Sequence, residues 1–415
     1  MSAASKRILL VLPCAIDANR GNATSAARIS ESLGRRGYQV NSAVVDSDPN
    51  DWPEFDLAIA FHAAHCGPTA KAICAQRNKP YVVLFTGTDL NGKPHATTED
   101  AVISASACVA LCKSAARRAR DIFTEIPSGI DVIFQAVLPL PYKPGGKIPA
   151  DAPELQPIQK LVLVPAGVRD IKDPLRAVKA LTPLAAIRPE LVLWFAGPEL
   201  EESCGEQLRA ALAETSWAYW IGEVPRAELL PLMRRADVVL STSRSEGAAP
   251  NSLLEAVLAG TPVLASDIPP HKEFPGGAHC FREDRLLRRK LEKILDDTTE
   301  AAREVRKLQE VVRHKHGLSA EQLAWDRLLG NLLEPDRPRT PAKPMKPRKS
   351  ELPKKWDRPK NAERSGPSAI SEDEDQSKPT SPRKPAPPRE PSAPKKPSGK
   401  SESPWGKARE KRDRP

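Results

Sequence analysis

The chain has 415 residues, 40% of them hydrophobic, and a formal net charge of +10. This length allows two or three domains with sizeable cores. The positive charge is local, because residues 336–415 hold 23 Lys and Arg against 12 Asp and Glu, whereas residues 1–335 hold 40 against 41. The body of the chain therefore has no overall basic charge that would favour binding to nucleic acid.

The cysteines and the apolar runs indicate the cellular compartment in which the protein is expected. The seven cysteines are odd in number and form no Cys-x-x-Cys motif, which argues against a disulfide framework or a zinc cage. We therefore expect reduced thiols in a cytoplasmic protein, with peripheral attachment to a membrane as the alternative. No apolar run reaches the roughly 18 residues of a membrane helix. The apolar run at 8–13 leads into a polar turn, which favours a buried strand over a signal peptide.

Apolar strands alternate with helical stretches over residues 1–140. Strands are expected within 7–13, 56–63, 81–89 and 107–112, and helices within 21–38 and 113–123. Strands that are apolar almost throughout, in a β-then-α order, are typical of a parallel sheet covered on both faces. We therefore predict an N-terminal Rossmann-like domain at residues 1–140.

The pattern stops and then restarts. Residues 141–157 are rich in Pro and Gly and lack periodicity, so they are predicted to be a linker. Further strands are expected within 160–166, 191–197, 217–222, 236–243 and 261–266, and helices near 173–184, 203–214, 226–235 and 251–259. We predict a second Rossmann-like domain at 158–300, C-terminal helices at 301–334, and a disordered Pro/Lys-rich tail at 335–415.

Two cations follow the first strand of the second domain. Two doubly wound domains joined by a linker create a cleft, and ligands bind outside the carboxyl ends of such strands. Arg169 and Lys172 stand at this place, ahead of a helix predicted to begin at Pro174. Arg can bind a diphosphate bidentately and Lys as a point charge. We predict a diphosphate loop, with a solvated basic loop as the alternative.

The segment 244–266 predicts a loop, a short helix and a strand. The backbone N–H groups of Gly247, Ala248 and Ala249 precede the helix N-terminus, where they can bind an anion. Glu246 suits the hydroxyls of a group attached to that phosphate. Glu255 can accept two hydrogen bonds from a cis-diol such as ribose. The alternative is that both glutamates are ordinary loop and helix residues.

Small or polar residues follow other predicted strands. Gly197 would let a ligand approach the backbone, and His62 is a candidate catalytic residue at the end of a strand. The remaining candidates form two loops for a phosphate or an acceptor: Gly21, Asn22 and Thr24, and Thr86, Gly87, Thr88 and Asp89. Convergence of such strand ends on one cleft favours a functional site over isolated structural side chains.

About residues 6–330 resemble a retaining glycosyltransferase of the GT-B fold, in the GT4-like family glycosyl transferases group 1. "SEGAAPNSLLEAVLAGTPVLAS" (245–266) is similar to the E-x7-E region of that family and its following Gly-x-Pro-Val strand. "AGVRDIKDP" (166–174) is similar to its Arg/Lys diphosphate loop. The resemblance implies two Rossmann-like domains facing across a cleft. It also implies an acceptor bound mainly to the first domain and a nucleotide sugar bound mainly to the second.

The resemblance also implies roles for single residues. Arg169 and Lys172 would hold the diphosphate, Glu246 would contact the donor sugar, and Glu255 would contact the ribose. His62 lies where the family often has a histidine near that sugar. No metal or other cofactor is expected, because protein cations and a helix N-terminus neutralise the leaving group. The implied reaction moves a sugar from a nucleoside-diphosphate sugar to an unknown acceptor with retained configuration.

One departure from the family keeps alternatives open. Glu246 and Glu255 are nine residues apart (255 − 246), one more than in the family, with an extra small residue in "GAAPN". Either the loop bulges before the helix, or one glutamate does not play its usual role. The alternatives are a non-catalytic nucleotide-sugar-binding protein with an interaction tail, and a selenosugar or thiosugar synthase that uses a nucleotide sugar.

The basic tail has two interpretations. The simpler is a solvated spacer. The other is weak attachment to an anionic partner such as RNA or a membrane surface, which would weaken steeply with salt.

Overall fold

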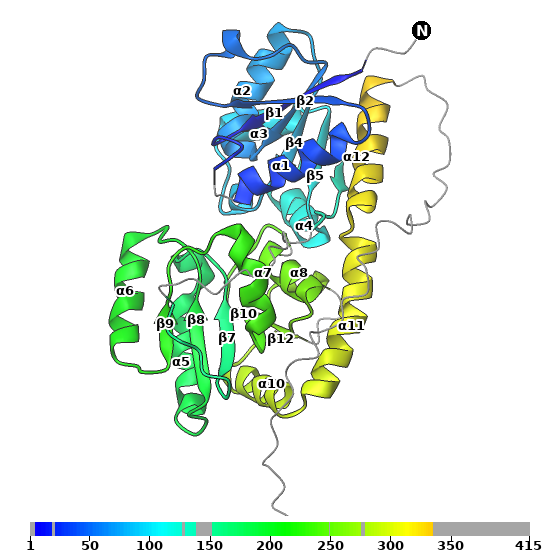
Figure 1. The fold of residues 1–415 in the computed structure, drawn as a ribbon. Coiled ribbons are helices and arrows are strands. Elements are labelled where there is room, and N and C mark those ends of the chain that lie inside the picture. Colours follow the sequence, from blue (N-terminus) through cyan, green and yellow to red (C-terminus); the bar gives the residue numbers. More distant parts are fainter. Residues whose placement is uncertain are drawn as a thin grey trace, which may run out of the picture. The chain divides into compact units, whose positions relative to one another are not determined.

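The structure is a computed structural model that describes residues 5–18, 21–126, 129–137, 152–248, 250–274 and 279–334. Within these residues the chain forms two six-stranded parallel sheets flanked by helices (Figure 1), as the sequence predicts. Residues 141–151 of the predicted linker and the whole predicted tail, 335–415, lie outside the described residues. The predicted domain boundaries stay predictions.

The first sheet has the strand order β2-β1-β3-β4-β5-β6, and every neighbouring pair is parallel. Its strands are β1 (Arg7–Leu12), β2 (Gln39–Val44), β3 (Leu57–Phe61), β4 (Tyr81–Phe85), β5 (Ala107–Ala110) and β6 (Ile130–Val132). The connections contain α1 (Gly21–Gly34), η1 (Pro49–Asp51), α2 (Ala63–Gln76), η2 (Thr88–Leu90), α3 (Ala96–Ile103) and α4 (Lys113–Ile122). β3 and β4 are buried along their whole length, which explains why their sequences are apolar rather than alternating.

The second sheet has the order β12-β11-β10-β7-β8-β9 and is also parallel. Its strands are β7 (Lys160–Val164), β8 (Leu191–Phe195), β9 (Ala218–Trp220), β10 (Val238–Ser241), β11 (Val263–Ser266) and β12 (Cys280–Phe281). The connections contain η3 (Asp170–Lys172), α5 (Pro174–Ala185), α6 (Glu202–Ala213), α7 (Arg226–Arg235), α8 (Asn251–Ala259) and α9 (Pro269–Glu273). From β7 the strands are added on one side, as β8 and β9. The next strand, β10, pairs with the other side of β7, and β11 and β12 follow on that side. A ligand crevice is therefore expected where the carboxyl ends of β7 and β10 separate.

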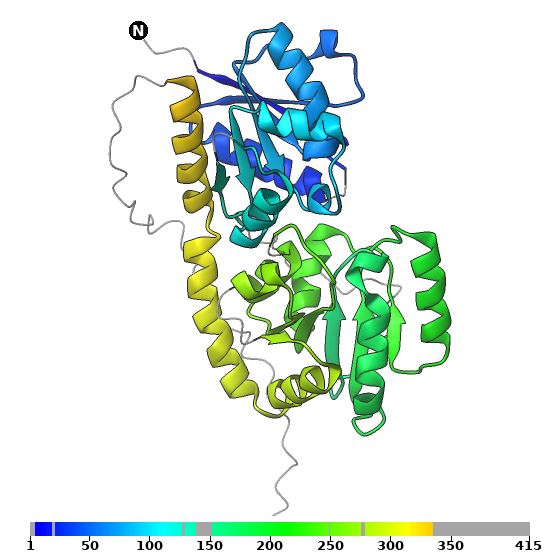
Figure 2. The same cartoon turned by 180° about the vertical axis from the view of Figure 1, so that it is seen from behind.

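Three helices follow the second sheet: α10 (Asp284–Asp296), α11 (Thr298–Lys315) and α12 (Leu318–Leu333). α11 contributes Val312 to a core cluster of the second sheet, whereas α12 contributes Trp325 and Leu329 to a core cluster of the first. Figure 2 shows α12, the gold helix, beside the first sheet. The predicted C-terminal helices are present, and the last of them belongs to the layer that covers the first sheet.

A buried ion pair fixes α12 in this place. Arg28 of α1 donates from Nε to Glu321 Oε1 at 3.0 Å, and the two side chains are 3% and 0% exposed. Glu321 also accepts a hydrogen bond from the backbone N–H of Ala136 at 3.1 Å. Neither charge can be left alone in this environment, because an unpaired buried charge is strongly destabilising.

Replacing Glu321 with Ala is expected to lower the free energy of unfolding by about 3–5 kcal/mol, because it leaves Arg28 buried and unpaired. The control is Asp326→Ala on α12, which removes the partly exposed pair of Asp326 with Arg36 and a hydrogen bond from the Tyr38 hydroxyl at 3.2 Å. That change should cost about 1–2 kcal/mol, less than the loss of Glu321. Urea unfolding of both variants tests the comparison, and equal losses would contradict it.

Candidate functional site

The topology of the second sheet brings a cation and a carboxylate together. Lys172 ends η3, the turn after β7, and Glu246 lies in the loop after β10. Because β7 and β10 are neighbours, these loops share one edge of the sheet. Lys172 Nζ donates to Glu246 Oε1, and the two side chains are 16% and 12% exposed.

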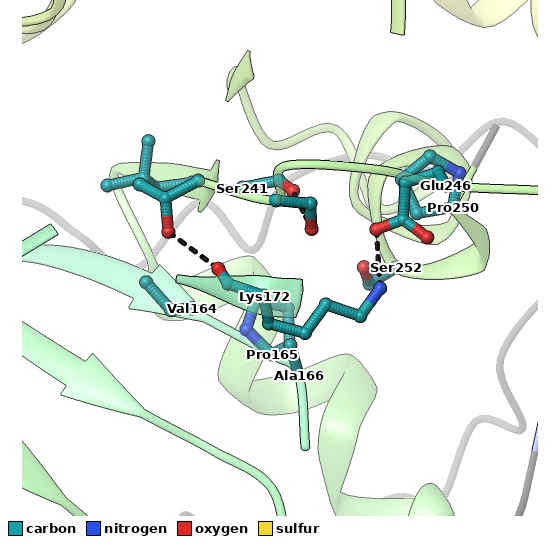
Figure 3. A pocket seen from close by; sticks show the side chains of 11 residues that line it. Val164, Pro165, Ala166, Lys172, Ser241, Glu246, Pro250 and Ser252 are labelled. Carbon is teal, nitrogen blue, oxygen red and sulfur yellow. Dashed lines mark hydrogen bonds and ion pairs between the residues drawn. The ribbon is translucent and has the colours of Figure 1, made fainter. Parts of the chain in front are cut away.

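A small cavity of about 10 Å³ lies at this edge (Figure 3). A cavity of this size holds about one water molecule. Its wall combines Lys172 and Glu246 with Pro250 and Ser252, which lie at the N-terminus of α8. The cationic turn and the positive end of the helix dipole therefore face the same space, as an anion site requires.

The electrostatics of Glu246 are set by two opposing effects. Burial alone would raise the pKa of Glu246, but the charge and the hydrogen bond of Lys172 outweigh it, so the pKa lies below its ordinary value. A hydrogen bond from Ser243 acts in the same direction. Glu246 is therefore a buried carboxylate that stays ionised only while a cation lies beside it.

Two residues that the sequence analysis missed hold the Lys172 turn. Thr242 Oγ1 donates to the carbonyl oxygens of Lys172 and Asp173 at 3.0 and 2.8 Å. Arg244 pairs with Asp170 at 2.8 Å and Asp173 at 3.0 Å. Only the strand order reveals these contacts, because they join segments about 70 residues apart.

Arg169 lies at the N-cap position of η3 and is partly buried. Its Nε atom is buried and has no hydrogen-bond partner among the described residues. A buried donor without an acceptor costs about 1–3 kcal/mol, which a bound anion would offset. The turn therefore carries a second cation with an unused donor.

Glu255 lies in α8, is 4% exposed, and pairs with Arg226 at 2.6 Å. Burial raises its pKa, and the charge of Arg226 offsets this only in part. Glu255 and Arg226 line a larger cavity of about 410 Å³, together with Asn251. Asp17, in the loop after β1, and Thr24, in α1, line the same cavity. Glu255 thus faces a space large enough for part of a ligand.

Gly197 is required for close packing. A Cβ at this position would lie 2.2 Å from the carbonyl oxygen of Ala166 in the loop after β7. Its N–H donates to Gly222 at 2.7 Å, and its carbonyl accepts from Trp220 Nε1 at 2.9 Å. These contacts explain the glycine without a ligand, so its predicted role in donor binding gains no support from them.

His62 follows β3 directly, at the N-cap position of α2, in a strained conformation with φ at 87°. Non-glycine residues in such conformations cluster at functional sites. Nδ1 accepts from the backbone N–H of His65 at 3.1 Å, so the proton of the neutral ring is on Nε2, which lies 2.9 Å from Thr88 Oγ1. Burial lowers the pKa of His62, which favours this neutral form. His62 is therefore held as a neutral hydrogen-bond donor.

Asp89 holds the loop after β4 in place. Its carboxylate accepts hydrogen bonds from the backbone N–H groups of Ala63, Thr86 and Gly87 at 2.9, 3.1 and 2.7 Å. The side chain is therefore occupied by its own backbone. Its part in the predicted acceptor loop is to fix the loop, which leaves Thr86 and Thr88 as the groups that can face a ligand.

The loop that carries Glu246 contacts the first sheet. A Cβ on Gly247 would lie 2.4 Å from the carbonyl oxygen of Thr86, and one on Gly87 would lie 2.6 Å from Gly247 Cα. Ala248 belongs to a core cluster of the first sheet. The amides of Gly247 and Ala248 were predicted to bind an anion, but neither residue lines the small cavity, so this prediction gains no support from it; Ala249 lies outside the described residues. The loop after Glu246 thus packs against the first sheet.

The loop after β1 is less constrained. Gly21 and Asn22 form the first turn of α1 and are exposed or partly exposed, whereas Thr24 lines the larger cavity. Of this predicted loop, Thr24 is the residue placed on a cavity wall.

Two further properties concern the described residues only. They contain no group of three or more His, Cys, Asp and Glu side chains that could hold a metal ion, and metal independence stays a prediction. Across the same ranges, no helix has the length and apolar character needed to span a membrane.

Comparison with known proteins identifies the class. Residues 151–309 match the family described as Glycosyl transferases group 1. A glycosyltransferase from Rickettsia africae ESF-5 has a TM-score of 0.65 at 14% identity, over 80% of this chain and 100% of its own. Anabaena HepE in complex with UDP and glucose has a TM-score of 0.60 at 15% identity, over 79% of this chain and 100% of its own. The chain has the GT-B fold of these glycosyltransferases, and the fold predicted from the sequence is confirmed.

The chain is similar to Glycosyltransferase 1 domain-containing protein 1 of Xenopus tropicalis, at 26% identity over 282 residues. The match covers 63% of this chain and 79% of that relative. The match of residues 151–309 to a family of glycosyl transferases favours catalysis over the non-catalytic alternative.

Replacing Lys172 with Met is expected to destabilise the protein more at pH 7 than at pH 4. In the wild type the lowered pKa of Glu246 contributes stability above the ordinary value of 4.5, and this contribution is lost as the pH falls. In the variant the largest of the effects that lower this pKa is gone and burial, which raises it, remains, so at pH 7 a carboxylate must be buried without a cation or take up a proton. We expect a loss of about 2–3 kcal/mol at pH 7.

Urea unfolding at both pH values measures this difference, with Lys172→Arg as the control that keeps the charge. An equal loss at pH 4 and pH 7 would mean that Glu246 does not depend on Lys172.

Proposed function

We propose that the chain is a retaining glycosyltransferase that uses a nucleoside-diphosphate sugar as donor. The observation that carries this proposal is that Lys172, Glu246 and the N-terminus of α8 face one space at the switch point of the second sheet. Anabaena HepE, which shares the fold, was crystallised with UDP and glucose. A uridine donor is therefore the first to test.

The diphosphate is proposed to bind between Arg169, Lys172 and the N-terminus of α8. Negative charge builds up on the diphosphate as the glycosidic bond breaks. Fixed cations and helix N–H groups stabilise this charge where it develops, which is often the largest contribution to catalysis. The unpaired Nε of Arg169 supports this role, because it is a buried donor without an acceptor among the described residues.

Donor binding is proposed to exchange partners at the ion pair. Without a ligand, Lys172 and Glu246 neutralise each other. A bound donor brings a diphosphate for Lys172 and sugar hydroxyls for Glu246, so both charges keep hydrogen-bonded partners. Glu246 then holds the sugar while Lys172 stabilises the leaving group.

The remaining groups are proposed to orient the donor and the acceptor. Glu255 accepts from the ribose hydroxyls on the wall of the larger cavity. His62, a neutral donor at Nε2, contacts the donor sugar in exchange for Thr88. The acceptor lies on the side of the first sheet, where Thr24 lines the cavity.

Release of nucleoside diphosphate from UDP-, GDP- and ADP-glucose, with and without a panel of hydroxyl acceptors, tests the function. The anomeric configuration of the product, measured by NMR, tests retention. Release of UDP that depends on selenophosphate would instead select the selenosugar alternative. Absence of diphosphate release and of nucleotide binding for all donors would falsify the proposal.

Arg169→Ala and Lys172→Ala are each expected to slow turnover on the order of 10²–10³-fold, because each removes a donor from the developing charge. Lys179→Ala is the matched control, since Lys179 is an exposed cation on the following helix. Initial rates at saturating donor measure the effect. Unchanged turnover in both site variants would remove the diphosphate assignment.

Glu255→Gln is expected to raise the donor KM about 10- to 100-fold with a smaller change in kcat, because hydrogen bonds to a charged acceptor contribute about 1.5–3 kcal/mol. A donor with a 2′-deoxyribose should bind the wild type and the variant with similar KM values. If the variant discriminates between the two donors as strongly as the wild type, Glu255 does not contact the ribose.

A further inference from the structure

A buried polar chain runs from α9 to the loop that carries Glu246. It begins at His271, which is 0% exposed, and passes through Ser266 at the end of β11 to Ser243 in the loop after β10, each 2% exposed. Three buried polar side chains in a row are unusual in the core of a sheet domain, since buried polar groups are costly unless they are paired.

The hydrogen bonds run in one direction. His271 Nδ1 lies 2.8 Å from the carbonyl oxygen of Ser266, so Nδ1 carries the proton and donates. The hydroxyl of Ser266 donates to the carbonyl oxygen of Ser243 at 2.5 Å. Ser243 lies three residues before Glu246 in the same loop. The imidazole is thus connected, through two hydrogen bonds, to the backbone of the loop that carries the Glu246 carboxylate.

These hydrogen bonds lie where the pairing of β10 with β11 ends. The pairing of β10 with β11 stops at Ser241 and Ala265, so Ser243 and Ser266 lie beyond the last ladder pair. The Ser266 hydroxyl replaces the missing backbone bond and ties the loop after β10 to β11. His271 in turn fixes the end of β11. The position of the Glu246 loop therefore depends on a residue of α9.

Packing alone does not explain an imidazole at this position. His271 Nε2 is buried and has no hydrogen-bond partner among the described residues, which costs about 1–3 kcal/mol. Burial lowers the pKa of His271, so the ring is neutral and Nε2 carries an unused lone pair. An apolar side chain would avoid this cost, and the contribution of the ring therefore lies in its Nδ1–H.

We propose that His271 is a positioning residue for the transferred sugar: through Ser266 and Ser243 it holds the Glu246 carboxylate toward the donor. The inference rests on the proposed function, because it assigns the sugar contact to Glu246. It predicts that His271 acts on the sugar half of the donor and leaves the diphosphate half unaffected.

Calorimetric titration of the full chain with UDP and with UDP-glucose tests this prediction. His271→Phe should lower the affinity for UDP-glucose relative to that for UDP about tenfold, with UDP itself bound as in the wild type. His271→Asn should retain the wild-type ratio, because its amide N–H replaces Nδ1–H. Ser266→Ala should lower the affinity for UDP-glucose relative to that for UDP as His271→Phe does. This variant tests the same prediction if His271→Phe does not fold.

The matched control is His316→Phe. His316 is also buried, its Nδ1 lies 2.9 Å from the carbonyl oxygen of Gln135, and its Nε2 has no partner in the described part of the chain. It lies outside the chain of hydrogen bonds from α9 to the loop that carries Glu246. Its replacement should lower the melting temperature and leave the ratio of the two affinities unchanged.

A second measurement separates this inference from the proposed function. Without a ligand, amide hydrogen exchange of residues 243–247 should speed up in His271→Phe and stay at the wild-type rate in His271→Asn. If the wild type binds UDP-glucose no better than UDP, the proposed sugar contact fails, and the exchange rates alone decide whether His271 holds the loop. Unchanged exchange in His271→Phe, or failure of Asn to restore the wild-type rate, overturns the inference.

Discussion

The arrangement of the site depends on the order of the parallel strands in the second sheet. Because β7 and β10 are neighbours, the turn after one and the loop after the other must share an edge. Lys172 and Glu246 meet there, and neither could be buried alone, since moving an isolated charge out of water costs several kcal/mol. Thr242 and Arg244 hold the loop after β10 to the Lys172 turn. The hydrogen bond from Ser266 to Ser243 holds the same loop to β11.

An internally neutralised pair suits a site that must fold empty and bind a charged ligand. A donor that carries both a diphosphate and hydroxyl groups supplies a partner for each member of the pair. Binding therefore replaces one set of contacts by another and leaves neither charge unpaired. Arg169 adds a positive charge that the pair does not cancel and a buried N–H that is unused within the described residues. The excess favours an anionic ligand over a neutral one.

The sequence predicts the local elements well and their contacts poorly. The expected helices at 226–235 and 251–259 coincide with α7 and α8, because Pro and Gly mark where helices begin and end. Strand order cannot be read from such signals. The hydrogen bonds and ion pairs by which Thr242 and Arg244 hold the Lys172 turn were therefore not predicted. The same holds for α12, whose buried Glu321 reveals its partner only once α1 is placed beside it.

The one-residue departure in the spacing of the two glutamates leaves both of them on cavity walls. Glu246 follows the end of β10 and Glu255 lies within α8, so a loop separates the two elements that place them. In that loop Gly247 lies against Gly87, and Ala248 enters a core cluster of the first sheet. A Cβ at residue 247 would meet backbone atoms of Thr86 and Gly87, so this contact requires glycine. The longer spacing is therefore no argument against catalysis, because both carboxylates still line cavities.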